Sequence, residues 1–221
     1  MANKNGECFL KFTIRHQVPA SSASEQVLGV DLGIRNLASL STGERFGGTE
    51  TDGLRRRFQK VRSSLQRKGT KGAKRVLKRL SGREKRYMAW VNHTISARIV
   101  RYARHHEMAV AMEDLTGIRT RARLGKCQRK ALHRWAFRQI RSFIMYKSLL
   151  AGVALILVNP AFTSQTCHRC HHIGTRQADS FRCGHCGYKG HADYNGAKNI
   201  ALLGACVTRP EHSLVCPLMG R

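Results

Sequence analysis

The chain has 221 residues and is strongly basic, with 40 lysines and arginines against 13 aspartates and glutamates and a formal charge of +27. Such a charge repels itself unless a polyanion neutralises it, so nucleic acid is the expected partner. A hydrophobic share of 42% excludes a disordered basic tail, and the longest apolar run, residues 149–158, is too short to span a bilayer. We therefore expect a folded nucleic-acid-binding protein with no membrane role.

The N-terminal part is expected to hold one strand and a linker before a small meander. Phe9–Ile14 alternates between apolar and polar residues, as a strand does, and a serine-rich stretch follows at residues 20–24. Three strands are then expected at residues 26–31, 37–40 and 45–47, with Asp31 at the end of the first.

Residues 54–106 follow a helical period, and Gly69 and Gly72 mark the expected turn between two helices. The outward faces are almost entirely positive, whereas a charged face that is only solvated usually carries both signs. We therefore favour contact with phosphates over mere solubility. The candidate nucleic-acid-binding residues are Arg55, Arg56, Arg57, Lys60, Arg62, Lys74, Arg75, Lys78 and Arg79.

The second half alternates short strands with helices. A buried strand at residues 108–112 is followed at once by Glu113, and a second basic stretch at residues 119–130 leads into a helix that ends near Gly152. A fifth strand is expected at residues 153–158, and the last helix at residues 193–203.

Three acidic residues stand at expected strand or helix ends: Asp31, Glu113 and Asp193. Taken singly, Asp31 could be a turn former, Glu113 a loop acid and Asp193 a helix N-cap. If they converge, their like charges need cations, and oxygen ligands with open positions suit Mg²⁺ or Mn²⁺. Two such ions about 4 Å apart could activate a water and stabilise the leaving oxygen of a phosphodiester. The basic surface favours this joint interpretation.

Four cysteines form the pattern C-x2-C-x12-C-x2-C, at Cys167, Cys170, Cys183 and Cys186. Two such pairs are typical of a structural Zn²⁺ site, with Gly184 and Gly187 able to take positive φ in the second turn. Disulfides or free thiols are the alternatives, but the N-terminus shows no secretory signal, so a reducing, cytoplasmic setting is expected. Nearby histidines could replace one thiolate: His168, His171, His172, His185 and His191. Cys8, Cys127, Cys206 and Cys216 have no paired spacing and are expected to be ordinary thiols.

Five segments carry motifs in a fixed order: VLGVDLGIRNLASLSTG, AMEDLTGI, ALHRWAFRQIRSFIMYKSLLAG, NPAFTSQTCHRC and FRCGHCGYKGHADYNGAKNI. From Val27 to Leu203 the chain resembles the nuclease part of the TnpB (OrfB) family of insertion-sequence proteins, which is similar to the type V CRISPR effectors. The resemblance implies an RNase H-like (RuvC) α/β fold, a five-stranded mixed sheet with long basic helices and an inserted C4 zinc ribbon. By the same resemblance, Asp31, Glu113 and Asp193 are the catalytic acids of the first, second and third motifs.

The resemblance also implies an activity, that of a transposon-associated, metal-dependent DNA endonuclease guided by RNA. Its partners would be a DNA target and a guide RNA, and the basic helices would face the guide–target duplex and read its shape and phosphates. Family members carry a substantial N-terminal part, a β-barrel wedge with a helical insertion, whereas only some 25 residues precede the nuclease core here. The alternative is therefore a truncated or split protein that binds nucleic acid without autonomous cleavage, with a separately encoded N-terminal half as its partner.

These expectations divide the chain into five parts. They are a remnant strand and linker (1–25), a RuvC-like core (26–160) that contains the basic helical hairpin (about 54–106), a zinc ribbon (161–192), the final RuvC helix (193–205) and a C-terminal tail (206–221).

Overall fold

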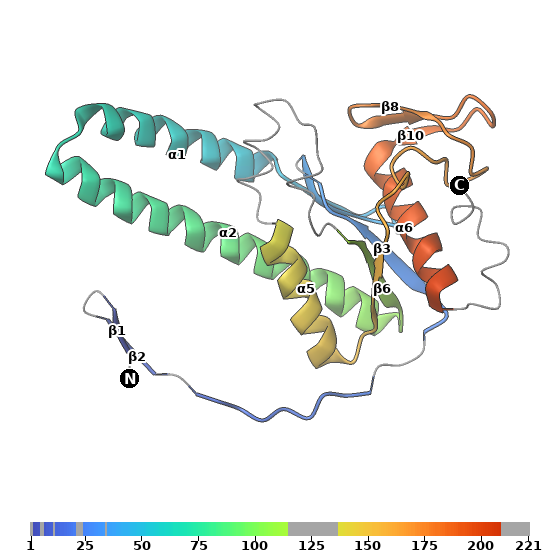
Figure 1. Ribbon diagram of the computed structural model, residues 1–221, viewed down its shortest axis with the longest axis horizontal. Coiled ribbons are helices and arrows are strands. Elements are labelled where there is room, and N and C mark those ends of the chain that lie inside the picture. Colours follow the sequence, from blue (N-terminus) through green and yellow to red (C-terminus); the bar gives the residue numbers. More distant parts are fainter. Residues whose placement is uncertain are drawn as a thin grey trace.

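The computed structural model describes residues 2–4, 7–10, 12–20, 24–33, 35–114 and 137–208 (Figure 1). Its centre is a five-stranded sheet of order β5-β4-β3-β6-β7. The strands are β3 (Val27–Asp31), β4 (Asn36–Leu40), β5 (Arg45–Gly47), β6 (Ala109–Glu113) and β7 (Leu155–Val158). The first three form an antiparallel meander, while β6 runs parallel to both β3 and β7. The expected mixed sheet is thus confirmed.

Side chains of β3 and β6 point alternately to the two faces of the sheet, so each strand contributes residues to two hydrophobic cores. Leu28 and Met112 face the core beneath α2 (Lys71–His105) and α5 (Phe137–Ala151). Val27 and Ala111 face the core beneath α6 (Ala192–Thr208). Figure 1 shows α2 and α5 on one face of the sheet and α6 on the other. This layering brings the start of α6 to one edge of the central strands.

A long helical hairpin, α1 (Thr49–Lys68) followed by α2, projects from the sheet (Figure 1). The turn lies at Gly69, whose φ of 64° ends α1, and at Thr70, whose hydroxyl accepts a hydrogen bond from the amide of Ala73 and begins α2. Gly72 was expected in this turn, but it lies within the first turn of α2, because Thr70 already caps the helix. Arg62 and Glu84 form an ion pair that ties the two helices together.

The N-terminal segment differs from the expectation. Two short strands, β1 (Ala2–Lys4) and β2 (Glu7–Phe9), form an antiparallel hairpin. The strand expected at residues 9–14 ends at Phe9, and residues 12–14 are not in a strand. Phe12 and Ile14 are 79% and 82% exposed, so their alternation meets neither a core nor a neighbouring strand among the described residues. An alternating apolar pattern does not stabilise a strand unless its apolar side chains are buried and its backbone pairs with a neighbouring strand.

Between β7 and α6 lies a small antiparallel sheet of order β10-β9-β8. Its strands are β8 (Thr175–Gln177), β9 (Ser180–Arg182) and β10 (Lys189–His191), and Phe181 packs with Cys167 and Cys183 in its own small core. No helix within the described ranges has the length and hydropathy needed to cross a membrane. The second basic stretch at residues 119–130, Cys127, Cys216 and most of the expected tail lie outside the described residues, as does the side chain of Cys8.

Candidate active site and zinc ribbon

Asp31 and Glu113 are the last residues of two neighbouring parallel strands, β3 and β6. The register pairs Val30 with Met112, so the two acids leave the sheet at the same edge. Asp193 is the second residue of α6 and is only 6% exposed. Because α6 packs along β3, its first turn reaches this edge as well. The structure therefore gathers the three acids that the sequence singled out.

Two glycines allow α6 to pack closely beside the acids. A Cβ atom on Gly29 of β3 would lie 2.0 Å from the carbonyl oxygen of Ala197, so only glycine allows the helix to lie so near the strand. A Cβ atom on Gly196 would lie 3.0 Å from Oδ2 of Asp31, so the helix backbone passes directly beside that carboxylate. Helix α6, which carries Asp193, thus packs directly against Asp31.

Asp31 lies within electrostatic reach of the other two carboxylates. Burial raises the pKa of Asp31 to about 8, and the charges of Glu113 and Asp193 contribute to the increase, while Arg176 opposes it. Burial also raises the pKa of Glu113, while the hydrogen bond from Thr163 and the charge of Arg176 lower it by less. Among the described residues, the three do not form a group whose ligand atoms all lie within 4.8 Å of one another. The site is therefore an open cluster of three acids.

Three further side chains contact the acids. Arg176 on β8 forms an ion pair with Oδ1 of Asp193 at 2.8 Å, and Nδ2 of Asn36 donates a hydrogen bond to Oδ2 of Asp193 at 2.9 Å. The hydroxyl of Thr163 donates to Oε1 of Glu113. Sequence reasoning missed all three. Asn36 and Thr163 stand within the motifs, whereas Arg176 lies between the cysteine pairs with no spacing that marks it.

The donor set of the cluster fits a divalent cation. It consists of carboxylate oxygens, which Mg²⁺ and Mn²⁺ prefer in proteins. Burial is the main cause of the raised pKa of Asp31, and the charges of Glu113 and Asp193 add to it. A bound cation would remove the mutual repulsion that contributes to this raised pKa.

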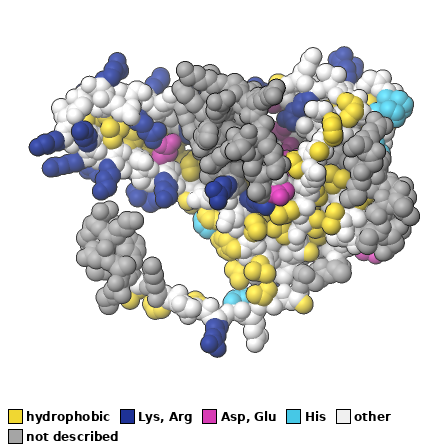
Figure 2. All heavy atoms as spheres, in the orientation of Figure 1, with side chains coloured by type: hydrophobic (Ala, Val, Ile, Leu, Met, Phe, Trp, Pro, Cys, Tyr) yellow, Lys and Arg dark blue, Asp and Glu magenta, His cyan; other side chains and the backbone are white. Residues whose placement is uncertain are grey.

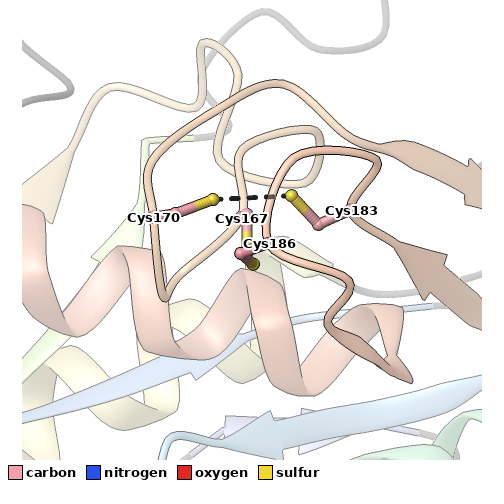
Figure 3. A group of neighbouring side chains, drawn as sticks. All are labelled: Cys167, Cys170, Cys183 and Cys186. Carbon is pink, nitrogen blue, oxygen red and sulfur yellow. Dashed lines mark hydrogen bonds between the residues drawn. The ribbon is translucent and has the colours of Figure 1, made fainter.

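The four cysteines of the C-x2-C pairs meet around one point (Figure 3). Their sulfurs all lie within 4.8 Å of one another, with Cys167 and Cys186 3.7 Å apart and Cys170 and Cys183 3.5 Å apart. Zn–S bonds of about 2.3 Å imply edges of about 3.8 Å in a tetrahedron, whereas a disulfide needs about 2.05 Å. The described cysteines form no disulfide. The cluster is compatible with a structural zinc ion.

Backbone amides donate to sulfurs in both turns, but in the first turn burial and the neighbouring thiols still raise the pKa of Cys167 and of Cys170, the latter to about 12. The amide of Cys186 donates to the sulfur of Cys183 and lowers the pKa of that thiol to about 6, against the effect of burial. Gly187 has a φ of 72°, and His171, at the equivalent place in the first turn, has a φ of 61°. Gly184 does not take positive φ, so that expectation was wrong: the turn reverses after the second cysteine.

Two exposed histidines lie beside the cluster. The rings of His172 and His185 stack 3.6 Å apart, and their nitrogens lie within 4.8 Å of one another and of the Cys170 sulfur. These two histidines and Cys170 form a second group of possible ligands, which shares Cys170 with the four-cysteine cluster. Cys206, in contrast, is a buried thiol in the core beneath α6.

Two family models match the chain: one described as "Probable transposase" over residues 11–116, and one described as "Cas12f1-like, TNB domain" over residues 137–200. A TnpB-like protein of Methanocaldococcus jannaschii is 35% identical over 117 residues, which cover 51% of this chain and 42% of that protein. The chain belongs to the TnpB family. The expected family membership is thus confirmed.

Other relatives of this TnpB-family chain are CRISPR-associated. The endodeoxyribonuclease Cas12f1 of Sulfoacidibacillus thermotolerans is 32% identical over 197 residues, covering 80% of this chain and 45% of that protein. A solved CRISPR-Cas12f ternary complex has the same fold, with a TM-score of 0.66 at 19% identity over 86% of this chain and 40% of the other. The fold is therefore RNase H-like, of the RuvC kind. The chain spans about half the length of the relatives that it matches.

The basic hairpin of this TnpB-family chain carries most of its expected cations on its surface. Arg55 differs, since its side chain is only 11% exposed and lies 3.6 Å from Asp52, and Arg62 is engaged with Glu84. The remaining expected residues are exposed: Arg56, Arg57, Lys60, Lys74, Arg75, Lys78 and Arg79. Figure 2 shows lysine and arginine side chains gathered at the far end of the hairpin. A groove along α2 is lined by Arg75, Lys78, Arg79, Arg83 and Arg86.

Proposed function

We propose that this TnpB-family chain is a metal-dependent DNA endonuclease of the RNA-guided type, in which Asp31, Glu113 and Asp193 form the catalytic site. The observation that carries the proposal is the convergence of these acids at one edge of the β3–β6 pair, each placed by a different element. Relatives in Escherichia coli and Streptomyces pristinaespiralis are named as putative RNA-guided DNA endonucleases. The acids are what such chemistry requires.

The carboxylates would hold Mg²⁺ or Mn²⁺, and a pair of such ions supplies activation of a water molecule and stabilisation of the leaving oxygen. The residues around the acids fix their orientation. Asn36 holds one oxygen of Asp193 and Arg176 holds the other, while Thr163 contacts Glu113. Arg176 also supplies positive charge at the place where a phosphodiester would approach.

The zinc ribbon would act as a structural support, with Zn²⁺ held by Cys167, Cys170, Cys183 and Cys186. Two ion pairs join it to the nuclease core. Arg176 on β8 contacts Asp193, and Asp179, in the turn between β8 and β9, contacts Arg35 at 2.6 Å. Folding of the ribbon therefore fixes Arg176 beside the acids.

The α1–α2 hairpin would bind the guide–target duplex through its phosphates. Its only acidic residues are Glu50, Asp52 and Glu84, and two of these are already paired with arginines. A solved Cas12f1 structure of the same fold, with a TM-score of 0.64 at 18% identity, is a complex with a guide RNA and target DNA. Guide RNA and a DNA target are accordingly the proposed partners.

A second candidate function is nucleic-acid binding without autonomous cleavage, with a separately encoded N-terminal half as the partner. One observation favours it: the cations of the hairpin do not depend on the carboxylates for their placement.

The test compares the full chain with Asp193→Ala. Co-purified RNA is sequenced, and labelled single-stranded DNA is incubated with Mg²⁺ and each protein. We expect cleavage by the parent only, with salt-sensitive binding retained by both, because binding depends on the lysines and arginines. Equal cleavage by parent and variant would contradict the assignment. Binding without cleavage by the parent would favour the second candidate.

A further inference from the structure

Thr163 lies between the last strand of the nuclease core and the first cysteine of the zinc ribbon. It is only 2% exposed, and its hydroxyl reaches Oε1 of Glu113 and, at 3.1 Å, the carbonyl oxygen of Pro160. A hydroxyl has one proton to donate, and a charged carboxylate is the stronger acceptor of the two. The side chain is therefore in a position to hold one oxygen of Glu113 in place.

The backbone around Thr163 is tightly constrained. The preceding residue, Phe162, has a φ of 61°, which non-glycine residues rarely adopt, and its carbonyl accepts from the amides of Gln165 and Thr166 at 3.0 Å. Such conformations persist only where the surroundings enforce them, and they cluster at functional sites. Thr163 therefore has little freedom to move away from Glu113.

Two buried asparagines of α6 hold the same segment. Nδ2 of Asn199 donates to the carbonyl oxygens of Thr163 and Thr166 at 2.8 and 2.7 Å, and Nδ2 of Asn195 donates to that of Thr166 at 2.6 Å. Oδ1 of Asn195 accepts from the amide of His168 at 3.0 Å. Both asparagines are 0% exposed, so the bonds are shielded from water and costly to break. The helix that carries Asp193 thus also fixes the segment that carries Thr163.

We propose that Thr163 is a positioning residue for Glu113, and that Asn195 and Asn199 set it from α6, so that the second and third acids share one support. This inference rests on the proposed carboxylate site. Residues 163–168 would then do more than join the core to the ribbon. They would position Glu113 at one end and supply Cys167 to the four-cysteine cluster at the other. Outer-shell partners of metal ligands are typically worth roughly 10- to 100-fold in metal affinity.

The experiment measures Mn²⁺ binding by electron paramagnetic resonance on the full, zinc-loaded chain. Thr163→Val removes the hydroxyl but keeps the shape, and Thr163→Ser keeps the hydroxyl. We expect Thr163→Val to weaken Mn²⁺ binding roughly tenfold and Thr163→Ser to stay near the parent value. Zinc content and DNA binding are expected to be unchanged in both. A purely structural hydroxyl, bonded to Pro160 alone, would leave the Mn²⁺ affinity of Thr163→Val unchanged and would overturn the proposal.

Glu113→Gln separates this inference from the proposed function. If it weakens Mn²⁺ binding while Thr163→Val does not, only the role of Thr163 is wrong. If the parent binds Mn²⁺ no better than Glu113→Gln, the carboxylate site itself is wrong, and the inference falls with it. Should Thr163→Val fail to fold, Thr163→Ser and Thr163→Ala, which differ only by the hydroxyl, decide the same question: equal affinities would overturn the proposal.

Discussion

The carboxylate site and the α1–α2 hairpin solve opposite electrostatic problems. The site brings Asp31, Glu113 and Asp193 together in partly or fully buried positions, where burial and repulsion raise the pKa of Asp31 to about 8. The hairpin spreads exposed cations along two helices, with few acids between them. Like charges are concentrated in the first region and dispersed in the second.

The difference determines how each region should respond to mutation. Each acid of the site comes from a separate element, so no other described residue stands in its place. The cations of the hairpin are interchangeable, because phosphates along a backbone attract any lysine or arginine within reach. Single substitutions should therefore abolish chemistry in one region and only weaken binding in the other.

The largest expected effect comes from Asp31→Asn, which keeps the shape of the side chain and removes its charge. We expect cleavage of labelled DNA in Mg²⁺ to fall by roughly 10³-fold or more, as for groups that act as a unit, with binding nearly unchanged. Glu44→Gln is the matched control, since Glu44 is a half-buried acid outside the site, paired with Arg98 at 2.7 Å. Similar cleavage by Asp31→Asn and Glu44→Gln would place the chemistry elsewhere.

Cys183→Ser should remove the zinc and unfold the ribbon, because the affinity of a structural site for zinc is also folding free energy, on the order of 10 kcal/mol. Mass spectrometry gives the zinc content, and hydrogen exchange reports on residues 167–191. Cys206→Ser, at a buried thiol outside the cluster, should keep its zinc. Full zinc occupancy in Cys183→Ser would contradict the four-cysteine assignment.

The stability of the Mg²⁺-free, zinc-loaded protein should fall as the pH rises from about 4 to about 8. The pKa of Asp31 is about 8 in the folded protein and about 3.9 in an unfolded chain. Within this window the folded state holds a proton that the unfolded state has released, so raising the pH favours unfolding. In urea unfolding, the free energy of unfolding of Asp31→Asn should therefore rise relative to that of the parent as the pH approaches 8. A difference between the two that is independent of pH would argue against a buried acid cluster.

The smallest expected effect concerns the hairpin. Replacing both Lys78 and Arg79 with alanine should weaken nucleic-acid binding and reduce the slope of its salt dependence by about 0.9 for each phosphate that the protein no longer neutralises. Arg62→Gln is the control, because its charge is already engaged with Glu84. It should lower thermal stability more than it changes the slope. An unchanged slope in the double variant would remove this part of α2 from the interface.

Much of the fold could be predicted because its elements obey simple patterns. The apolar runs that end at Asp31 and Glu113 form strands within a residue of their expected bounds. The C-x2-C spacing predicted that four cysteines meet at one point, as two thiolate pairs on tight turns do around a zinc ion. Membership of the TnpB family was visible in the order of the motifs.

The remaining features depend on interactions between distant segments. Phe9–Ile14 alternates like a strand, but a strand also needs a neighbouring strand, and none of the described residues pairs with residues 12–14. Gly72 was expected in the turn, but Thr70 is the N-cap of α2, so the helix has already begun at Gly72. Arg176 and Thr163 reach the acids across 17 and 50 positions of the chain, and no local pattern reveals such an interaction.

The most direct test of the central claim is a crystal of the full chain soaked in Mn²⁺ and measured at a wavelength where manganese scatters anomalously. The account predicts an anomalous peak in contact with oxygens of Asp31, Glu113 and Asp193, which disappears in Asp31→Asn. Manganese density only at other places, or an equal peak in the variant, would contradict it.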